Sequence, residues 1–114
     1  MNEAKKREII FYRDYFSNFY LKQRQKVKDK ILWTFRIIET HEIIPNEYFK
    51  YLDSSDGIFE IRVSLGNDIF RVFCFFDQGN LIVLANGFQK KSQKTPRTEI
   101  ERAIAIKKLY ENEK

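Results

Sequence analysis

The alternation of hydrophobic and polar positions predicts where the chain forms β-strands. In residues 59–65 (FEIRVSL) every odd position is apolar and every even position polar, the period-two pattern of a half-buried strand. Turn signals at residues 66–67 (Gly-Asn) and 78–80 (Gln-Gly-Asn) follow, and they predict an antiparallel meander. Three further apolar runs have the length of strands: residues 7–12 (REIIFY), 69–76 and 81–88.

A helical period follows the first predicted strand. Residues 14–42 are expected to be helical, with Asp14 as the cap and a break near residues 20–24. Pro45 ends this region, and residues 46–56 are predicted to form a loop. The apolar positions recur at intervals of four, four and three residues, which makes one stripe for a core: Val27, Ile31, Phe35 and Ile38.

The end of the chain predicts a final helix. Thr95 and Pro96 fit its cap and first position, and the helix should extend to about Tyr110. Its inward positions are expected to be Ile100, Ala103 and Ile104. The predicted order is β-α-α-β-β-β-α, an α+β fold in one domain, with the two N-terminal helices on one face of the sheet.

The predicted turns fix which side chains share a face of the sheet. If residues 66–67 form a two-residue loop, Arg62 lies directly opposite Arg71 on the same face. A loop at 78–79 would pair Arg71 with Asn86, and a loop at 79–80 would pair it with Phe88. Either register adds the even positions of the last strand to this face: Asn86, Phe88 and Lys90.

The two faces are expected to differ in kind. One is wholly apolar and needs the N-terminal helices as a cover: Phe59, Ile61, Val63, Leu65, Phe70, Val72, Cys74, Phe76, Leu81, Val83 and Ala85. The other mixes charged and polar residues with apolar ones: Glu60, Arg62, Arg71, Asn86 and Lys90, with Phe73, Phe75, Leu84 and Phe88.

Two opposed arginines are unfavourable by themselves. Like charges directly opposite on a sheet cost about 0.2–1 kcal/mol. An anionic ligand such as a phosphate, bound between the two arginines, would offset their repulsion. Alternatively, Glu60 neutralises one arginine and the other charges are solvated.

Composition narrows the class of protein. The chain has 114 residues, of which 43% are hydrophobic and 32% charged, so we expect one globular domain. One Cys and one His exclude a disulfide framework and a multi-histidine metal site. There is no apolar run of membrane-spanning length and no apolar signal core. We therefore expect a soluble, cytoplasmic protein without metal or cofactor.

The net charge of +5 is unevenly distributed. Residues 22–30 (KQRQKVKDK) hold five basic residues and one acidic residue, and residues 89–98 (QKKSQKTPRT) hold four basic residues and no acidic one. For the first stretch, a solvated helix face is the simpler explanation. The second directly follows a predicted strand, which favours an anionic partner such as nucleic acid.

Three segments together resemble a known family: GIFEIRV (57–63), IFRVFCFF (69–76) and GFQKKSQKTP (87–96), the last followed by Glu99. They resemble the RelE/HigB-like toxins of bacterial type II toxin–antitoxin systems, in particular the phage-derived branch of the RelE/ParE superfamily. The resemblance implies a microbial-RNase-like α+β fold with an antiparallel sheet. It also implies ribosome-dependent mRNA cleavage and neutralisation by a cognate antitoxin, expected to be HigA-like with a helix-turn-helix part.

The resemblance also assigns site residues. It makes Arg62 and Arg71 the residues that bind and activate the scissile phosphate, and it adds Lys90 and Lys91 after the last strand. Metal-independent cleavage by the 2′-hydroxyl needs charge stabilisation and proton transfer. Lys90 or Lys91 would donate the leaving-group proton or hold charge, and Glu60 would be the base or a structural partner of an arginine. The expected RNA-binding residues are Asn86, Phe88, Lys94, Arg97, Lys26 and Lys30, although a Phe on a strand more often serves packing.

Some features stay open. The single His41 is expected at a helix end, far in sequence from the basic face, and Tyr110 is not assigned a catalytic role. A ParE-like toxin that inhibits DNA gyrase and an inactive relative that only binds an antitoxin are the alternatives. Clustered bases on one sheet face argue against the first of these.

Overall fold

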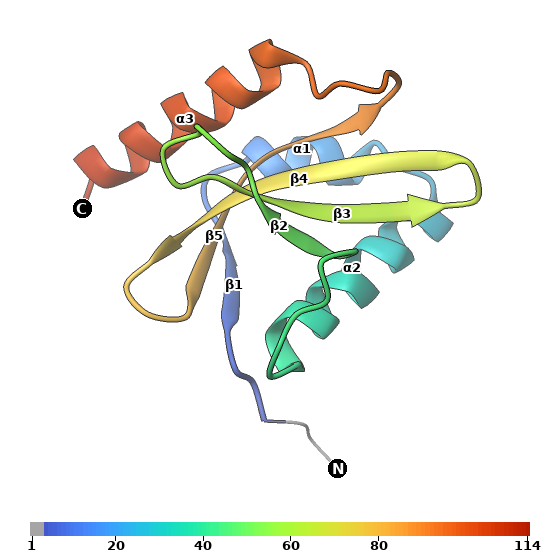
Figure 1. The fold of residues 1–114 in the computed structure, drawn as a ribbon, viewed down its shortest axis with the longest axis horizontal. Coiled ribbons are helices and arrows are strands. Elements are labelled where there is room, and N and C mark those ends of the chain that lie inside the picture. Colours follow the sequence, from blue (N-terminus) through green and yellow to red (C-terminus); the bar gives the residue numbers. More distant parts are fainter. Residues whose placement is uncertain (1–3) are drawn as a thin grey trace.

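The computed structural model describes residues 4–114 and has an α+β architecture, as predicted (Figure 1). The strands form a single five-stranded sheet, and helices lie on both of its sides. The elements in chain order are β1 (Glu8–Phe11), α1 (Tyr15–Leu21), α2 (Gln25–Thr40), β2 (Phe49–Tyr51), β3 (Phe59–Leu65), β4 (Asp68–Asp77), β5 (Leu81–Lys90) and α3 (Arg97–Asn112).

The sheet is mixed, which corrects the expected purely antiparallel sheet. Its strand order is β1-β5-β4-β3-β2, and β2 to β5 pair antiparallel with their neighbours. The edge strand β1 runs parallel to β5. Parallel neighbours need a long connection, and here both N-terminal helices and the meander lie between them. The local pattern of residues 7–12 predicts a strand but contains nothing that sets the direction of a distant partner.

Strand β2 was not predicted, so the observed order contains one strand more than expected. It lies within residues 46–56, which were assigned to a loop. Its pattern is too short to recognise, because only Phe49 is buried while Lys50 and Tyr51 are exposed. β2 pairs with the first part of β3 and forms the outer edge of the sheet.

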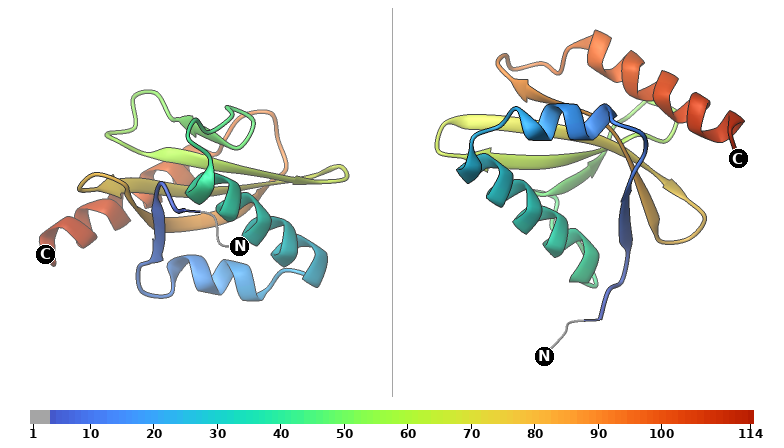
Figure 2. Two further views of the ribbon diagram at one scale, coloured as in Figure 1. Left: turned by 90° about the horizontal axis from the view of Figure 1, so that it is seen from below. Right: turned by 180° about the vertical axis from the view of Figure 1, so that it is seen from behind.

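The helices divide into two layers (Figures 1 and 2). α1 and α2 cover one face, with the predicted break between them at residues 22–24. The predicted stripe of α2 is fully or almost fully buried there, against Ile61, Val63, Phe70 and Val72 of the sheet. The N-terminal helices therefore cover the apolar face, as expected.

Helix α3 covers part of the opposite face, the one that bears the arginines. A second core lies beneath it, formed by Ile58, Phe73, Phe75, Val83, Ala85, Phe88, Ala103 and Ile106. Ala103 is buried as predicted, whereas Ile100 and Ile104 are only partly buried and Ile106 is the larger side chain enclosed.

The predicted register of the first hairpin is confirmed, since Arg62 pairs with Arg71 across β3 and β4. Arg71 pairs with Phe88, one of the two expected registers. A register shift between Val72 and Cys74 then changes the alternation of β5.

This β-bulge makes part of the face assignment wrong. Before it, Ile82 and Leu84 face α1 and α2, while Val83 and Ala85 face α3, the reverse of what was expected. Leu81 shares the side of Val83 by alternation. The bulge inserts one extra residue into β5, and a single inserted residue exchanges the faces of a strand.

Within residues 4–114, none of the three helices has the length and apolar character that crossing a membrane requires.

Candidate anion-binding site

Strands β3 and β4 place two arginines side by side on the face that α3 leaves partly open. Arg71 is almost completely buried, with 8% of its side chain exposed, whereas Arg62 keeps 33%. A carboxylate on the same face accompanies them, because Glu60 precedes Arg62 by two residues. The pair therefore consists of one guanidinium within the sheet surface and one at its rim.

One carboxylate oxygen serves both arginines. Oε1 of Glu60 lies 3.3 Å from Nε of Arg62 and 3.7 Å from Nε of Arg71. Glu60 itself is buried. Because one negative charge faces two positive charges, the trio keeps a net charge of +1. Neutralisation by Glu60, one of the two readings left open by the sequence, is thus real but incomplete.

The hydrogen bonding of Arg71 is also incomplete. Its Nη1 donates to the carbonyl oxygen of Phe70 at 3.1 Å, whereas its buried Nε has no hydrogen-bond partner in the described part of the chain. Burial lowers the pKa of Arg71 from its ordinary value, Glu60 opposes this shift, and the charge of Arg62 adds to it. A buried donor without an acceptor is costly. An anion at this face would compensate the excess charge.

Lys90 shares the face of Arg71 but points toward its own loop. It pairs with Ile69, two positions outward from the Arg71–Phe88 pair. Its Nζ donates to the carbonyl oxygens of Ser92 (2.7 Å) and Gln93 (2.6 Å), which orders the loop between β5 and α3. Lys91 is exposed beside it. Both lysines line an open hollow between this loop and the β3–β4 turn.

Asn86 and Phe88 connect the sheet to α3. Nδ2 of Asn86 donates to the backbone oxygen of Glu99 at 3.2 Å and to its Oε1 at 2.9 Å. Phe88 is 8% exposed and packs at an angle against Phe73, with ring centroids 5.3 Å apart. Packing, the alternative considered from the sequence, accounts for Phe88, and both residues hold α3 in place.

The remaining predicted RNA-binding residues fall into two groups. Lys94 and Arg97 are exposed at the start of α3, where Arg97 pairs with Glu101 at 3.5 Å. Lys26 and Lys30 lie on α2, in the layer that covers the opposite face. The structure therefore brings Glu60, Arg62, Arg71 and Lys90 together on one sheet face and places the α2 lysines apart from them.

The other groups considered for proton transfer lie elsewhere. His41 is exposed at the C-terminal end of α2. The hydroxyl of Tyr110 donates to Oδ2 of Asp77 at 2.6 Å, six residues along β4 from Arg71, which corresponds to about 20 Å. Among residues 4–114, no three His, Cys, Asp or Glu side chains form a group that could hold a metal ion.

One basic residue of this face was missed. Lys50 of β2 pairs directly with Glu60, so the two share a face, and Lys50 is exposed. The sequence gives little indication of this position, because the three residues of β2 are too few for their alternation to predict a strand.

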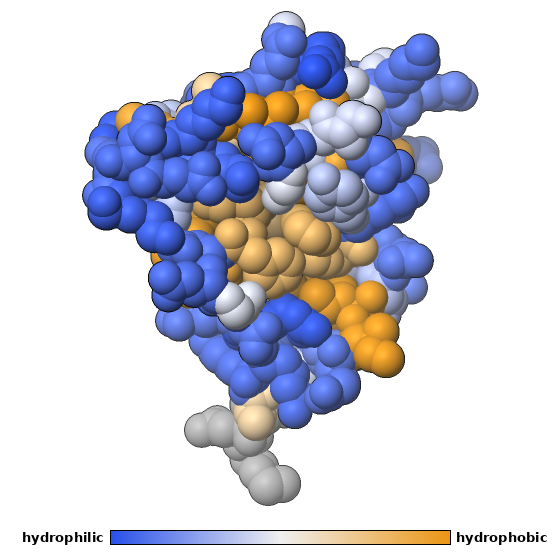
Figure 3. Space-filling model, turned by 60° about the vertical axis from the view of Figure 1, so that its left-hand side comes forward, coloured by the Kyte–Doolittle hydropathy of each residue, from blue (hydrophilic) through white to orange (hydrophobic). Residues whose placement is uncertain are grey.

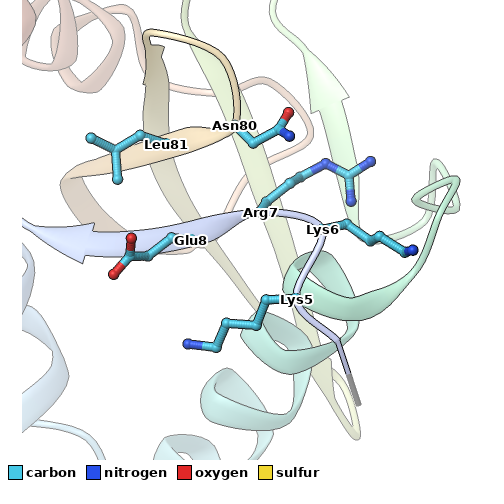
Figure 4. Close-up of a pocket in the computed structure, with 6 residues that line it drawn as sticks. All are labelled: Lys5, Lys6, Arg7, Glu8, Asn80 and Leu81. Atoms are coloured by element: carbon cyan, nitrogen blue, oxygen red, sulfur yellow. The ribbon is translucent and has the colours of Figure 1, made fainter.

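Two other surface hollows have different characters. The residues that line the first include Lys5, Lys6 and Arg7 (Figure 4). Lys5 and Lys6 pair with Glu39 and Glu42, and Arg7 donates to three carbonyl oxygens at the end of α2. This cluster attaches β1 to α2.

The second hollow is apolar and lies at the β2 edge of the sheet. It is lined mainly by Ile43, Ile44, Phe49, Phe59 and Phe76. On this side of the molecule Figure 3 shows an apolar area framed by hydrophilic residues. Neither hollow contains two opposed basic side chains that share one carboxylate, as the arginine pair does.

Comparison with known proteins identifies the family. Residues 18–108 match the family described as Phage derived protein Gp49-like (DUF891). The match covers most of the chain, from α1 to α3, and the protein therefore belongs to this phage-derived family. A search among curated proteins found no match. The family agrees with the resemblance to the phage-derived branch of the RelE/HigB-like toxins.

Proposed function

We propose that this protein is the toxin of a type II toxin–antitoxin system and cleaves mRNA on the ribosome. The observation that carries the proposal is the Arg62–Arg71 pair, which shares one carboxylate and keeps excess positive charge on an accessible sheet face. Membership in the Gp49-like family supports a toxin-like role. In this proposal the anion is a backbone phosphate of RNA, which guanidinium groups match in charge and geometry.

Cleavage proceeds by attack of the ribose 2′-oxygen on the adjacent phosphorus. The 2′-hydroxyl loses its proton to solvent water, the bond from phosphorus to the 5′-oxygen breaks, and the 5′-oxygen takes up a proton, which leaves a 2′,3′-cyclic phosphate and a 5′-hydroxyl. Arg62 is the exposed member of the pair and contacts the phosphate oxygens. Arg71, opposite it across β3 and β4 and more deeply buried, stabilises the negative charge that grows on them. Loss of one such contact typically costs a factor of about 10²–10³ in rate.

Proton transfer in this proposal uses lysine rather than imidazole. Two of the three Nζ protons of Lys90 are used by Ser92 and Gln93, which leaves one for a substrate oxygen. Lys91 is exposed beside it and supplies charge or the leaving-group proton. We assign Glu60 to positioning, because its Oε1 holds both arginines in place.

The proposal includes the partners that the resemblance implies. They are the ribosome with its mRNA and a cognate antitoxin, expected to be a HigA-like helix-turn-helix protein. The fold is proposed to be RelE-like, and the site of action is the bacterial cytoplasm.

Expression in bacterial cells distinguishes the candidate activities. The proposal predicts growth arrest with shortened mRNAs and intact chromosomal DNA. DNA damage without mRNA shortening would contradict it in favour of a gyrase inhibitor. Normal growth at a verified level of folded protein would contradict it in favour of an inactive antitoxin-binding relative.

A further inference from the structure

The only tryptophan of the chain lies exposed on α2. Trp33 keeps 47% of its surface exposed, although tryptophan is the residue with the most apolar surface to bury. It lies beside the buried stripe, on the flank of α2 toward Leu65 of β3, in a row with Lys26, Lys30 and Ile37 at intervals of four, three and four residues. Trp33 is not among the buried residues through which α2 packs on the sheet, so that packing does not require a large aromatic side chain at this position.

The Trp33 ring lies next to a positive charge and packs against a second aromatic ring. Nζ of Lys30 lies 4.2 Å from the ring centroid, and Tyr48 packs at 80° with ring centroids 5.6 Å apart. An open hollow beside the ring is lined by Lys26, Asp29, Lys30, Trp33 and Leu65. Asp29, its one acidic residue, accepts a hydrogen bond from Gln25 at 2.8 Å.

This hollow is connected to the arginine pair through β3. The backbone N–H of Arg62 donates to the carbonyl oxygen of Tyr48 at 2.9 Å, and Tyr48 is the residue that supports Trp33. Leu65, at the other side of the hollow, follows Arg62 by three residues, about 10 Å along the strand. β2 pairs only with residues 59–61 of β3. In the described part of the chain, no strand pairs with the outer edge of β3 beyond Arg62, from Val63 to Leu65.

We infer that Trp33, Lys26 and Lys30 form a second binding site, which takes single-stranded RNA that continues around the outer edge of β3 from the segment held by Arg62. One base stacks on the Trp33 ring, and the two lysines meet the adjoining phosphates. The base displaces the ammonium of Lys30 from the ring toward a phosphate. The choice of RNA as the ligand rests on the proposed function. The charge of the α2 surface alone predicts only contacts with the RNA phosphate backbone, and the inference adds stacking of a base on Trp33.

The chemistry favours a single strand over a duplex or a protein. Aromatic platforms beside basic side chains are typical of single-stranded nucleic-acid sites, because unpaired bases expose their flat faces. In a duplex these faces are stacked within the helix. Lys26 and Lys30, in a stretch with five basic residues and one acidic residue, supply the charge that a phosphate backbone requires.

The single tryptophan provides a direct readout. The full-length Arg71→Ala variant, used to prevent cleavage, is titrated with a short single-stranded oligoadenylate, with an abasic strand of equal length and with a duplex. Saturable quenching of Trp33 fluorescence by the oligoadenylate alone is the expected result. Unchanged fluorescence at saturating RNA would overturn the inference. A change that depends on protein concentration without RNA would also overturn it, in favour of contact between two copies.

Substitutions give a second, independent readout. Trp33→Ala should weaken oligoadenylate binding, measured by fluorescence anisotropy of a labelled strand, by about 5- to 100-fold, while Trp33→Phe keeps part of the affinity. Leu32→Ala is the matched control, since Leu32 neighbours Trp33 on α2 and is equally exposed at 48%. Equal affinities of Trp33→Ala and Leu32→Ala would overturn the inference.

The outcomes separate this inference from the proposed function. If Trp33 stacks on RNA but cells expressing the wild-type chain retain intact mRNA, the binding site stands and the nuclease proposal fails. If mRNA is cleaved but Trp33→Ala binds oligoadenylate normally, the nuclease proposal stands and the stacking site fails.

Discussion

Arg62 lies directly opposite Arg71 across strands β3 and β4, and the same oxygen of Glu60 is within ion-pair distance of both. The two arginines differ in burial, because Arg62 is at the rim and Arg71 is enclosed. We therefore expect their substitutions to have different effects.

Arg62→Ala should reduce cleavage by about 10²–10³-fold with little loss of stability, because the side chain is one-third exposed. Arg71→Ala should reduce both cleavage and the melting temperature, because it removes a buried group from the sheet. Translation-coupled cleavage and thermal unfolding measure the two effects. Arg102→Ala, at an exposed position of α3, is the control. Wild-type cleavage by both site variants would contradict the site.

Glu60→Gln should destabilise the fold by about 3 kcal/mol, because it leaves two opposed arginines with no carboxylate between them. Urea unfolding measures the loss, and added salt should recover part of it by screening the arginine pair. The matched control is Glu101→Gln, which breaks the exposed pair with Arg97 and should cost less than about 1 kcal/mol.

The cleavage activity of the Glu60→Gln variant distinguishes a positioning role from that of a base. A positioning residue leaves the shape of the pH–rate profile unchanged while the rate falls. Loss of the acidic limb of the profile would instead identify Glu60 as the base.

Asp77 should make stability depend on pH in the acidic range. Hydrogen bonds from Lys114 and Tyr110 lower the pKa of Asp77 from its ordinary value of 3.8. Its contribution is therefore complete above that value and is lost as the pH falls through the lower folded-state pKa. Asp77→Asn should lower the urea midpoint at neutral pH and have less effect at strongly acidic pH. The exposed Asp53→Asn is the control, and an equal effect of Asp77→Asn at both pH values would contradict this role.

Gly87 lets α1 approach β5 closely. A Cβ at this position would lie 2.5 Å from Cδ2 of Phe19, so Gly87→Ala should destabilise the protein by about 1–3 kcal/mol in urea unfolding. Adding Phe19→Leu should relieve part of this strain, so the two changes should not be additive. Strict additivity would show that the clash is not the cause.

The first hairpin was predictable from sequence because a two-residue turn fixes its register. Given the turn at residues 66–67, alternation alone places Glu60, Arg62 and Arg71 on one face. The apolar stripe of α2 was predictable for a similar reason, since its spacing allows only one buried side.

The second hairpin was less predictable because two local features act against simple alternation. The turn at residues 78–80 has three residues, with Gln78 and Gly79 in the left-handed region. The bulge lies farther along the hairpin, in the part of β5 between Leu84 and Gly87. Nothing in the apolar run 81–88 marks the position where its faces exchange. The short strand β2 and the loop contacts of Lys90 depend on tertiary neighbours and leave no periodic signal.

The most direct test of the central claim maps the ends of mRNA incubated with the purified protein, with and without ribosomes. The account predicts new 5′-hydroxyl ends within translated codons only when ribosomes are present, and their loss in the Arg62→Ala variant. Intact mRNA in the presence of translating ribosomes and folded wild-type protein, or equal cleavage by Arg62→Ala, would contradict it.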